Sequence, residues 1–123
     1  MRDLPHLPLA MALSVLSAQA LADLEVPWQV VGRQGLLQVV IVPKAVVRDT
    51  AAYKAEITRL CPPERACFVN FHENTSGVKA ELPLPDAIAA EATARFRRSM
   101  KNGAELFQWS CRMGVQASDT PCF

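Results

Sequence analysis

The chain has 123 residues, half of them hydrophobic, and its 13 Lys and Arg against 12 Asp and Glu leave a formal net charge of +1. This length suits one compact domain and is too short for two. The balanced charge gives no reason to expect nucleic acid or an anionic membrane surface as a partner.

The first 22 residues have the pattern of an export signal. Arg2 precedes an apolar run at residues 9–16, and small residues end the segment at Ala20 and Ala22. The run is too short to span a bilayer, and these two alanines suit a signal peptidase. We therefore expect cleavage after residue 22, which leaves residues 23–123 as one exported domain, periplasmic or secreted. No later apolar run reaches the length of a membrane helix, so no membrane span is expected after cleavage.

All four cysteines follow this segment, and an oxidising compartment favours disulfides over free thiols. Cys61 and Cys67 enclose a short segment with two prolines, which favours their pairing and leaves Cys111 with Cys122. The alternative, Cys61 with Cys111 and Cys67 with Cys122, stays open. These spacings do not match the Cys-x-x-Cys motifs of zinc or thioredoxin-type sites, so no metal and no cofactor is expected.

The exported domain is expected to begin with a β-hairpin. Residues 25–31 are rich in β-branched and aromatic side chains, and residues 36–42 are almost wholly apolar, with two glycines in the loop at residues 32–35. This pattern predicts two strands. The second strand does not alternate, which indicates burial on both faces and a central place in the sheet.

A helix and a third strand are expected next. Tyr53, Ile57 and Leu60 recur with helical spacing, which predicts a helix over residues 48–60. Residues 67–72 then read as a strand. A strand, a helix and a strand of this length form a right-handed βαβ unit.

A second helix is expected to begin at residue 85 or 86 and to end at residues 102–103. Ile88, Ala92 and Phe96 recur every four residues, and Met100 continues the row. Residues 105–112 alternate between two faces and predict a last strand.

These elements predict the fold class. The order is ββαβαβ, and it corresponds to a small single domain of the α+β or α/β class. We expect a mixed sheet of about four strands with two helices, stapled by two disulfides.

The sequence holds no catalytic signature. His72 is the only histidine of the exported part, and Glu73 beside it points to the opposite face of a strand, so the two are poorly placed to act as a pair. No Gly-x-Ser-x-Gly motif is present. We therefore expect His72 to be a surface histidine at a strand end and the chain not to be an enzyme.

The ends of the strands form a candidate ligand site. Ligands of α/β sheets collect beyond the carboxyl ends of parallel strands. In this chain those ends carry Lys44, His72, Glu73, Asn74 and Arg112. The simpler interpretation is that strand ends meet polar loops in any such fold.

The one dense basic cluster is a candidate partner surface. Arg95, Arg98 and Lys101 share one face of the expected second helix at spacings of three, where an acidic partner would dock. The simpler interpretation is a solvated helical face, in which Glu91 pairs with Arg95.

The expected function is binding. We expect a monomeric exported protein that acts on an unknown protein or envelope partner, as an inhibitor, an immunity-type protector or an envelope accessory. One alternative is a small hydrolase or transferase with a strand-end site around His72, and another is a structural envelope component. Binding predicts an exposed apolar or charged patch without a deep pocket, whereas an enzyme predicts a pocket that holds His72.

Overall fold

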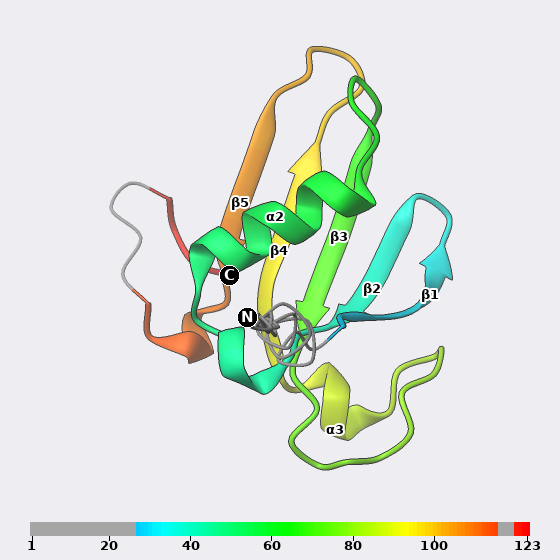
Figure 1. Cartoon of the computed structure of the whole chain (residues 1–123), viewed down its shortest axis with the longest axis vertical. Helices are drawn as coiled ribbons and strands as arrows, with labels where there is room; N and C mark the ends of the chain where they lie inside the picture. The colour runs from blue at the N-terminus through cyan, green and yellow to red at the C-terminus, as the bar shows by residue number, and fades with distance from the viewer. Residues whose placement is uncertain (1–26, 116–119) are drawn as a thin grey trace, which may run out of the picture.

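The computed structural model describes residues 27–115 and 120–123, so the predicted export signal lies outside the described residues. The chain forms a small single domain in which helix α2 lies across one face of a five-stranded mixed sheet (Figure 1). The strands are β1 (Gln29–Gln34), β2 (Leu37–Ile41), β3 (Cys67–His72), β4 (Ala92–Arg98) and β5 (Glu105–Trp109). The helices are η1 (Lys44–Val46), α2 (Thr50–Leu60), α3 (Asp86–Ala89) and η2 (Cys111–Met113).

The strands lie in the sheet in the order in which they occur in the chain. β1 and β2 form an antiparallel hairpin, whose turn has Gly35 in the left-handed region at φ 65°. β3 runs parallel to β2 and is reached through α2, while β3 with β4 and β4 with β5 are antiparallel. The predicted hairpin, the first helix, the third strand and the mixed sheet are thus confirmed.

α2 begins and ends where its sequence dictates. The Asp49 carboxylate accepts a hydrogen bond from the backbone N–H of Ala52 at 3.2 Å, which caps the first turn. Two prolines after Cys61 prevent the helix from continuing. The helix buries Tyr53 and Ile57 against the sheet.

The core is built around one tyrosine. The rings of Trp28, Phe71, Phe107 and Trp109 all pack edge-on against Tyr53, at centroid distances of 5.0 to 5.6 Å. These rings come from the start of the described chain, from β3 and from β5. Edge-to-face aromatic contacts add to the stabilisation that burial alone provides.

The predicted second helix is wrong in its greater part. Only Asp86–Ala89 is helical, and residues 92–98 form β4, so the sheet has five strands and not four. A repeat of four residues also satisfies the two-residue period of a strand, and therefore Ala94 and Phe96 face the core while Arg95 and Arg97 face away. Pairing with both β3 and β5 satisfies the backbone of β4 and overrides the helical propensity of its alanines.

Both predicted disulfides are present at bonding distance, and the alternative pairing is not adopted. The Cys61–Cys67 bond joins the end of α2 to the start of β3, and Cys111–Cys122 ties the C-terminal residues to η2. No cysteine is free. Two structural disulfides indicate an oxidising, extracytoplasmic environment. Within residues 27–115 and 120–123, no helix is long and apolar enough to cross a membrane.

The face of the sheet that α2 leaves open is partly covered by the segment between β3 and β4. Ile88 of this segment is fully buried. Leu82 packs on Gly32 of β1, where an added Cβ atom would lie 2.8 Å from Leu82 Cδ1. This segment lies beyond the carboxyl end of β3 (Figure 1).

The C-terminal residues cover a second part of this open face. The Gln108 side chain donates to the Pro121 carbonyl at 3.0 Å. The Arg95 guanidinium lies 4.3 Å from the centroid of the Phe123 ring. The opposite end of the open face, where the β1–β2 and β4–β5 turns lie, keeps exposed apolar side chains.

Candidate functional site

The predicted strand-end residues are engaged mainly with the protein itself. Glu73 and Arg112 form an ion pair of 3.1 Å, and Arg112 also donates to the Ala92 carbonyl at 3.2 Å. Asn74 closes a local turn, because its side chain donates to the Val78 carbonyl at 2.7 Å. Lys44 is exposed on η1. The structure therefore brings together two of the five residues, Glu73 and Arg112, and their opposite charges are paired with each other.

His72 is not the surface histidine that its position suggested, and that expectation is wrong. The side chain is only 7% exposed, and its Nδ1 atom lies 3.0 Å from the Ile88 carbonyl oxygen. Burial lowers the pKa of His72, and the nearby Arg112 charge lowers it further, although the Ile88 carbonyl opposes both effects. His72 does not line the hollow of about 410 Å³ or the hollow of about 260 Å³ that are described below.

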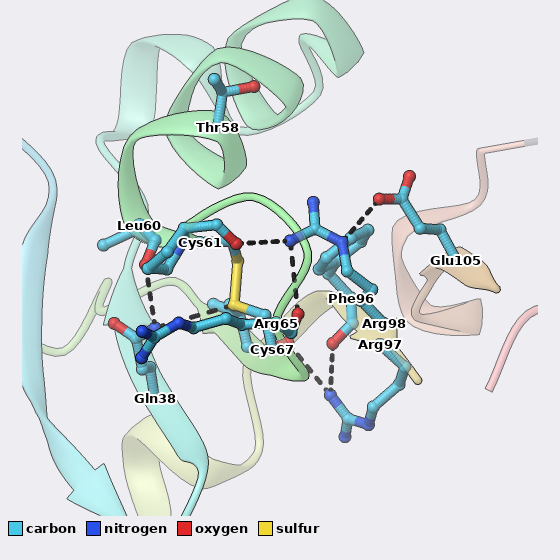
Figure 2. Close-up of a disulfide and its surroundings, with 12 residues drawn as sticks. Gln38, Thr58, Leu60, Cys61, Arg65, Cys67, Phe96, Arg97, Arg98 and Glu105 are labelled. Atoms are coloured by element: carbon cyan, nitrogen blue, oxygen red, sulfur yellow. Dashed lines mark hydrogen bonds and ion pairs between the residues drawn. A yellow bond between two sulfur atoms is a disulfide. The ribbon is translucent and has the colours of Figure 1, made fainter. Parts of the chain in front are cut away.

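The three predicted basic residues do not share a face, because β4 replaces the expected helix. Arg98 forms an ion pair with Glu105 at 2.7 Å and donates to the Pro62 carbonyl at 3.0 Å, beside the Cys61–Cys67 bond (Figure 2). Arg95 lies on the other face of β4 and donates to Gln108 at 2.8 Å. Lys101 lies in the β4–β5 turn. Arg98 therefore stabilises the fold and does not extend a basic patch with Arg95.

An open hollow lies at the turn end of the sheet, and we call it the turn-end groove. Its volume is about 410 Å³. It is formed by the β1–β2 turn, the start of β3, the end of β4, the β4–β5 turn and the start of β5. Its lining residues are Leu36, Ala66, Phe68, Arg97, Ser99, Met100, Ala104, Glu105 and Leu106.

The walls of the turn-end groove are apolar and accessible. Met100 is 73% exposed, Leu36 is 61% exposed and Leu106 is 43% exposed. These are three of the six large hydrophobic side chains that stand out as exposed among the described residues. Exposed apolar residues that are scattered singly need no explanation, whereas these three line one hollow.

Arg97 is the charged group of the turn-end groove. Its guanidinium donates to the carbonyls of Val69 and Phe96 at 3.2 and 2.8 Å and to Asn70 Oδ1 at 2.8 Å. It also lies 5.7 Å from the centroid of the Phe68 ring. In Figure 2 it points away from Arg98 and from the disulfide. Partial burial lowers the pKa of Arg97, and the like charge of Arg95 adds to this effect.

A second, smaller hollow of about 260 Å³ adjoins the turn-end groove and shares Leu36, Ala66 and Met100 with it. Two further arginines, Arg33 and Arg65, line this hollow. The apolar walls of the groove are thus bordered by positive charge on this side.

Sequence reasoning did not identify the turn-end groove, because its residues come from four separate segments. One signal was present: Leu36 and Met100 are large apolar residues beside the glycine-containing turns of Gly35 and Gly103, where polar residues are usual. A second signal was Leu106, which lies opposite the core-facing Phe107 and Trp109 in the alternating last strand.

Comparisons with known proteins found no match: no family model matches the chain, and no curated protein or solved structure is significantly similar to it. Within the part of the chain that the structure describes, no three His, Cys, Asp or Glu side chains are grouped as metal ligands would be.

Proposed function

We propose that this chain is an exported binding protein of the periplasm, and that it holds a partner protein at the turn-end groove. The observation that carries the proposal is the gathering of Leu36, Met100 and Leu106 in one open hollow. Buried apolar side chains supply most of the energy of protein association, and a water-exposed cluster of them costs solubility unless it has a use.

The position of His72 supports binding over catalysis. A general acid or base must lie within hydrogen-bond reach of its substrate. His72 is buried against the Ile88 carbonyl and lines neither hollow. The shape of the turn-end groove points the same way, because small-molecule sites enclose most of their ligand and this hollow is open.

The chemistry of the chain supports the proposed compartment. The pattern of residues 1–22 is typical of an export signal, and both cysteine pairs are at bonding distance. The partner is accordingly a protein of the envelope or of the periplasm, and inhibitors, immunity-type proteins and envelope accessories are the classes that fit.

Site-specific photo-crosslinking in the native host tests the proposal. A photoreactive residue at Met100 should trap a discrete partner, because this side chain is exposed at the groove. Val78 is the matched control, since it is 41% exposed but lies in the segment between β3 and β4.

Leu106→Ser, added to the protein with the photoreactive residue at position 100, should reduce the amount of crosslinked product. The melting temperature should stay close to that of the same protein without Leu106→Ser. Val78→Ser should leave the product unchanged. Equal products from positions 100 and 78, or a Met100 product that Leu106→Ser does not reduce, would contradict the proposal.

A further inference from the structure

The guanidinium of Arg97 has more N–H donors at the turn-end groove than the described residues accept from it. Arginine carries five N–H donors, and three of them bond to Val69, Phe96 and Asn70. Two donors therefore remain without an acceptor among the described residues. No described carboxylate lies within ion-pair distance of Arg97 either.

The surroundings of Arg97 make this charge costly to hold alone. The side chain is partly buried between Phe68 and Leu106, and Arg95 is its neighbour on the same face of β4. A cation that is partly removed from water is stabilised by an opposite charge, and a bidentate carboxylate matches the guanidinium best. The three existing hydrogen bonds hold the group in place, so little side-chain entropy is lost when an anion binds.

We propose that the turn-end groove binds an extended acidic peptide segment of the partner, with a carboxylate on Arg97 and the flanking apolar side chains against Leu36, Met100 and Leu106. This inference rests on the proposed function and adds the chemistry of the partner. Arg97 is the residue that sets the specificity.

Charge around the groove favours an acidic segment. Arg33 and Arg65 border the adjoining hollow, and Lys101 lies next to Met100 in the β4–β5 turn. None of these three cations is paired with a described carboxylate, whereas Glu105 at the groove is already held by Arg98. Complementary potentials raise association rates and exclude partners of the wrong charge.

A peptide explains the groove better than other anions do. A phosphate backbone is bound by a broad basic surface, but the formal net charge of the chain is only +1 and the groove walls are largely apolar. A small carboxylic acid would stay largely exposed in so open a hollow. A peptide segment buries apolar side chains on both sides of the carboxylate and so uses the whole groove.

Selection from a phage-displayed library of random short peptides tests the inference on the full chain, exported and purified in its oxidised form. The enriched peptides should carry Asp or Glu next to Leu, Phe, Trp or Met. Synthetic copies in which Asn or Gln replaces the acid should bind about 10- to 100-fold more weakly.

Variants of Arg97 assign the contact. Arg97→Gln should lower the affinity for the acidic peptides about 10- to 100-fold. Arg97→Lys should lower this affinity less, since Lys keeps the charge but loses the bidentate geometry. Arg97→Glu should instead bind the copy in which Lys replaces the acid. Lys54→Gln, on the exposed face of α2, is the control and should bind as the wild type does.

Several outcomes would overturn the inference. Enrichment of neutral or basic peptides would contradict the proposal that the ligand is acidic. Equal affinity of the wild type and Arg97→Gln for the enriched peptides would contradict it as well. If such peptides still lose affinity with Leu106→Ser, the groove binds a partner of other chemistry and the proposed function stands. Peptides insensitive to both variants would contradict both proposals. A dimer in solution that Leu106→Ser dissociates would make a second copy of this chain the occupant and overturn the acidic-segment inference.

Discussion

Replacing Tyr53 with phenylalanine should destabilise the domain and change how its stability depends on pH. The Tyr53 hydroxyl donates to the Val47 carbonyl at 2.7 Å, and its oxygen lies 2.9 Å from the Thr93 hydroxyl, which is fully buried. The variant keeps the ring but leaves both partners without this bond. A buried polar group that loses its partner costs about 1 to 3 kcal/mol, so the free energy of unfolding at neutral pH should fall by about that amount.

The pH dependence follows from the buried hydroxyl. Burial raises the pKa of Tyr53 from 10.0 to about 12, with the Thr93 hydrogen bond opposing the rise. The folded state therefore keeps its proton more tightly, and the unfolded chain ionises first as the pH rises. The stabilisation is complete below pH 10 and is lost between pH 10 and pH 12. A difference of about two pKa units corresponds to about 3 kcal/mol.

Urea unfolding of the wild type and of Tyr53→Phe, in steps between neutral pH and pH 12, measures both effects. The wild type should lose about 3 kcal/mol more than the variant between pH 10 and pH 12, so at pH 12 the variant should be as stable as the wild type or more stable. Tyr53 is the only tyrosine of the chain, so the near-ultraviolet absorbance of tyrosinate reports its ionisation directly. Ionisation near pH 10 in the folded protein, or parallel losses in both proteins, would refute the reasoning.

Three further predictions use the same unfolding assay. Phe96→Ala should cost about 3 to 5 kcal/mol, because the side chain is 5% exposed in the core; an unchanged midpoint would contradict the placement of β4. Arg98→Glu should cost about 1 to 2 kcal/mol by placing two carboxylates together, and Glu105→Arg in the same chain should restore part of the loss; a variant as stable as the wild type would show that the ion pair contributes nothing. His72→Asn should make the domain less sensitive to acid. Because the pKa of His72 is lower in the folded protein, the unfolded chain takes up the proton first, and the free energy of unfolding of the wild type falls as the pH drops below 6.5. Equal acid sensitivity of the two proteins would show that folding does not change the titration of His72.

The parts of the fold that the sequence predicted correctly are those with local causes. Asp49 and the Pro62–Pro63 pair mark the two ends of α2, and the spacing of Tyr53 and Ile57 marks its buried face. The Cys61–Cys67 pairing was predictable because the two cysteines lie only six residues apart around a bend. Each of these signals needs only a few neighbouring residues to be interpreted.

The error at residues 92–98 has a non-local cause. Ala92 and Phe96 are spaced by four residues, and this spacing fits the two-residue period of a regular strand as well as the turn of a helix. What decides between the two is the partner: β3 and β5 offer an edge on each side, with Val69 and Phe107 opposite Phe96. Val69 lies 27 residues before Phe96 in the chain, so a short window of local sequence around Phe96 does not contain its partner on the β3 side.

The sequence directed attention to the strand ends and not to the turn-end groove for a related reason. The carboxyl-end rule applies to parallel strands, and β2 with β3 is the single parallel pair of this sheet. At that end the chain folds over itself: Ile88 covers His72, and Arg112 takes the Glu73 carboxylate. At the opposite end, where the β1–β2 and β4–β5 turns lie, the described residues leave Leu36, Met100 and Leu106 exposed.

The two ends of the open face differ in a way that bears on function. At the carboxyl end of β3 the charges are paired, as Glu73 and Arg112 show, so a ligand there would first have to break an ion pair. At the turn end Arg97 is held by neutral acceptors alone and keeps two donors without described partners. An incoming carboxylate would add a charge-assisted bond without displacing another acid. Binding energy is therefore available at the turn-end groove and is already used at the other end of the face.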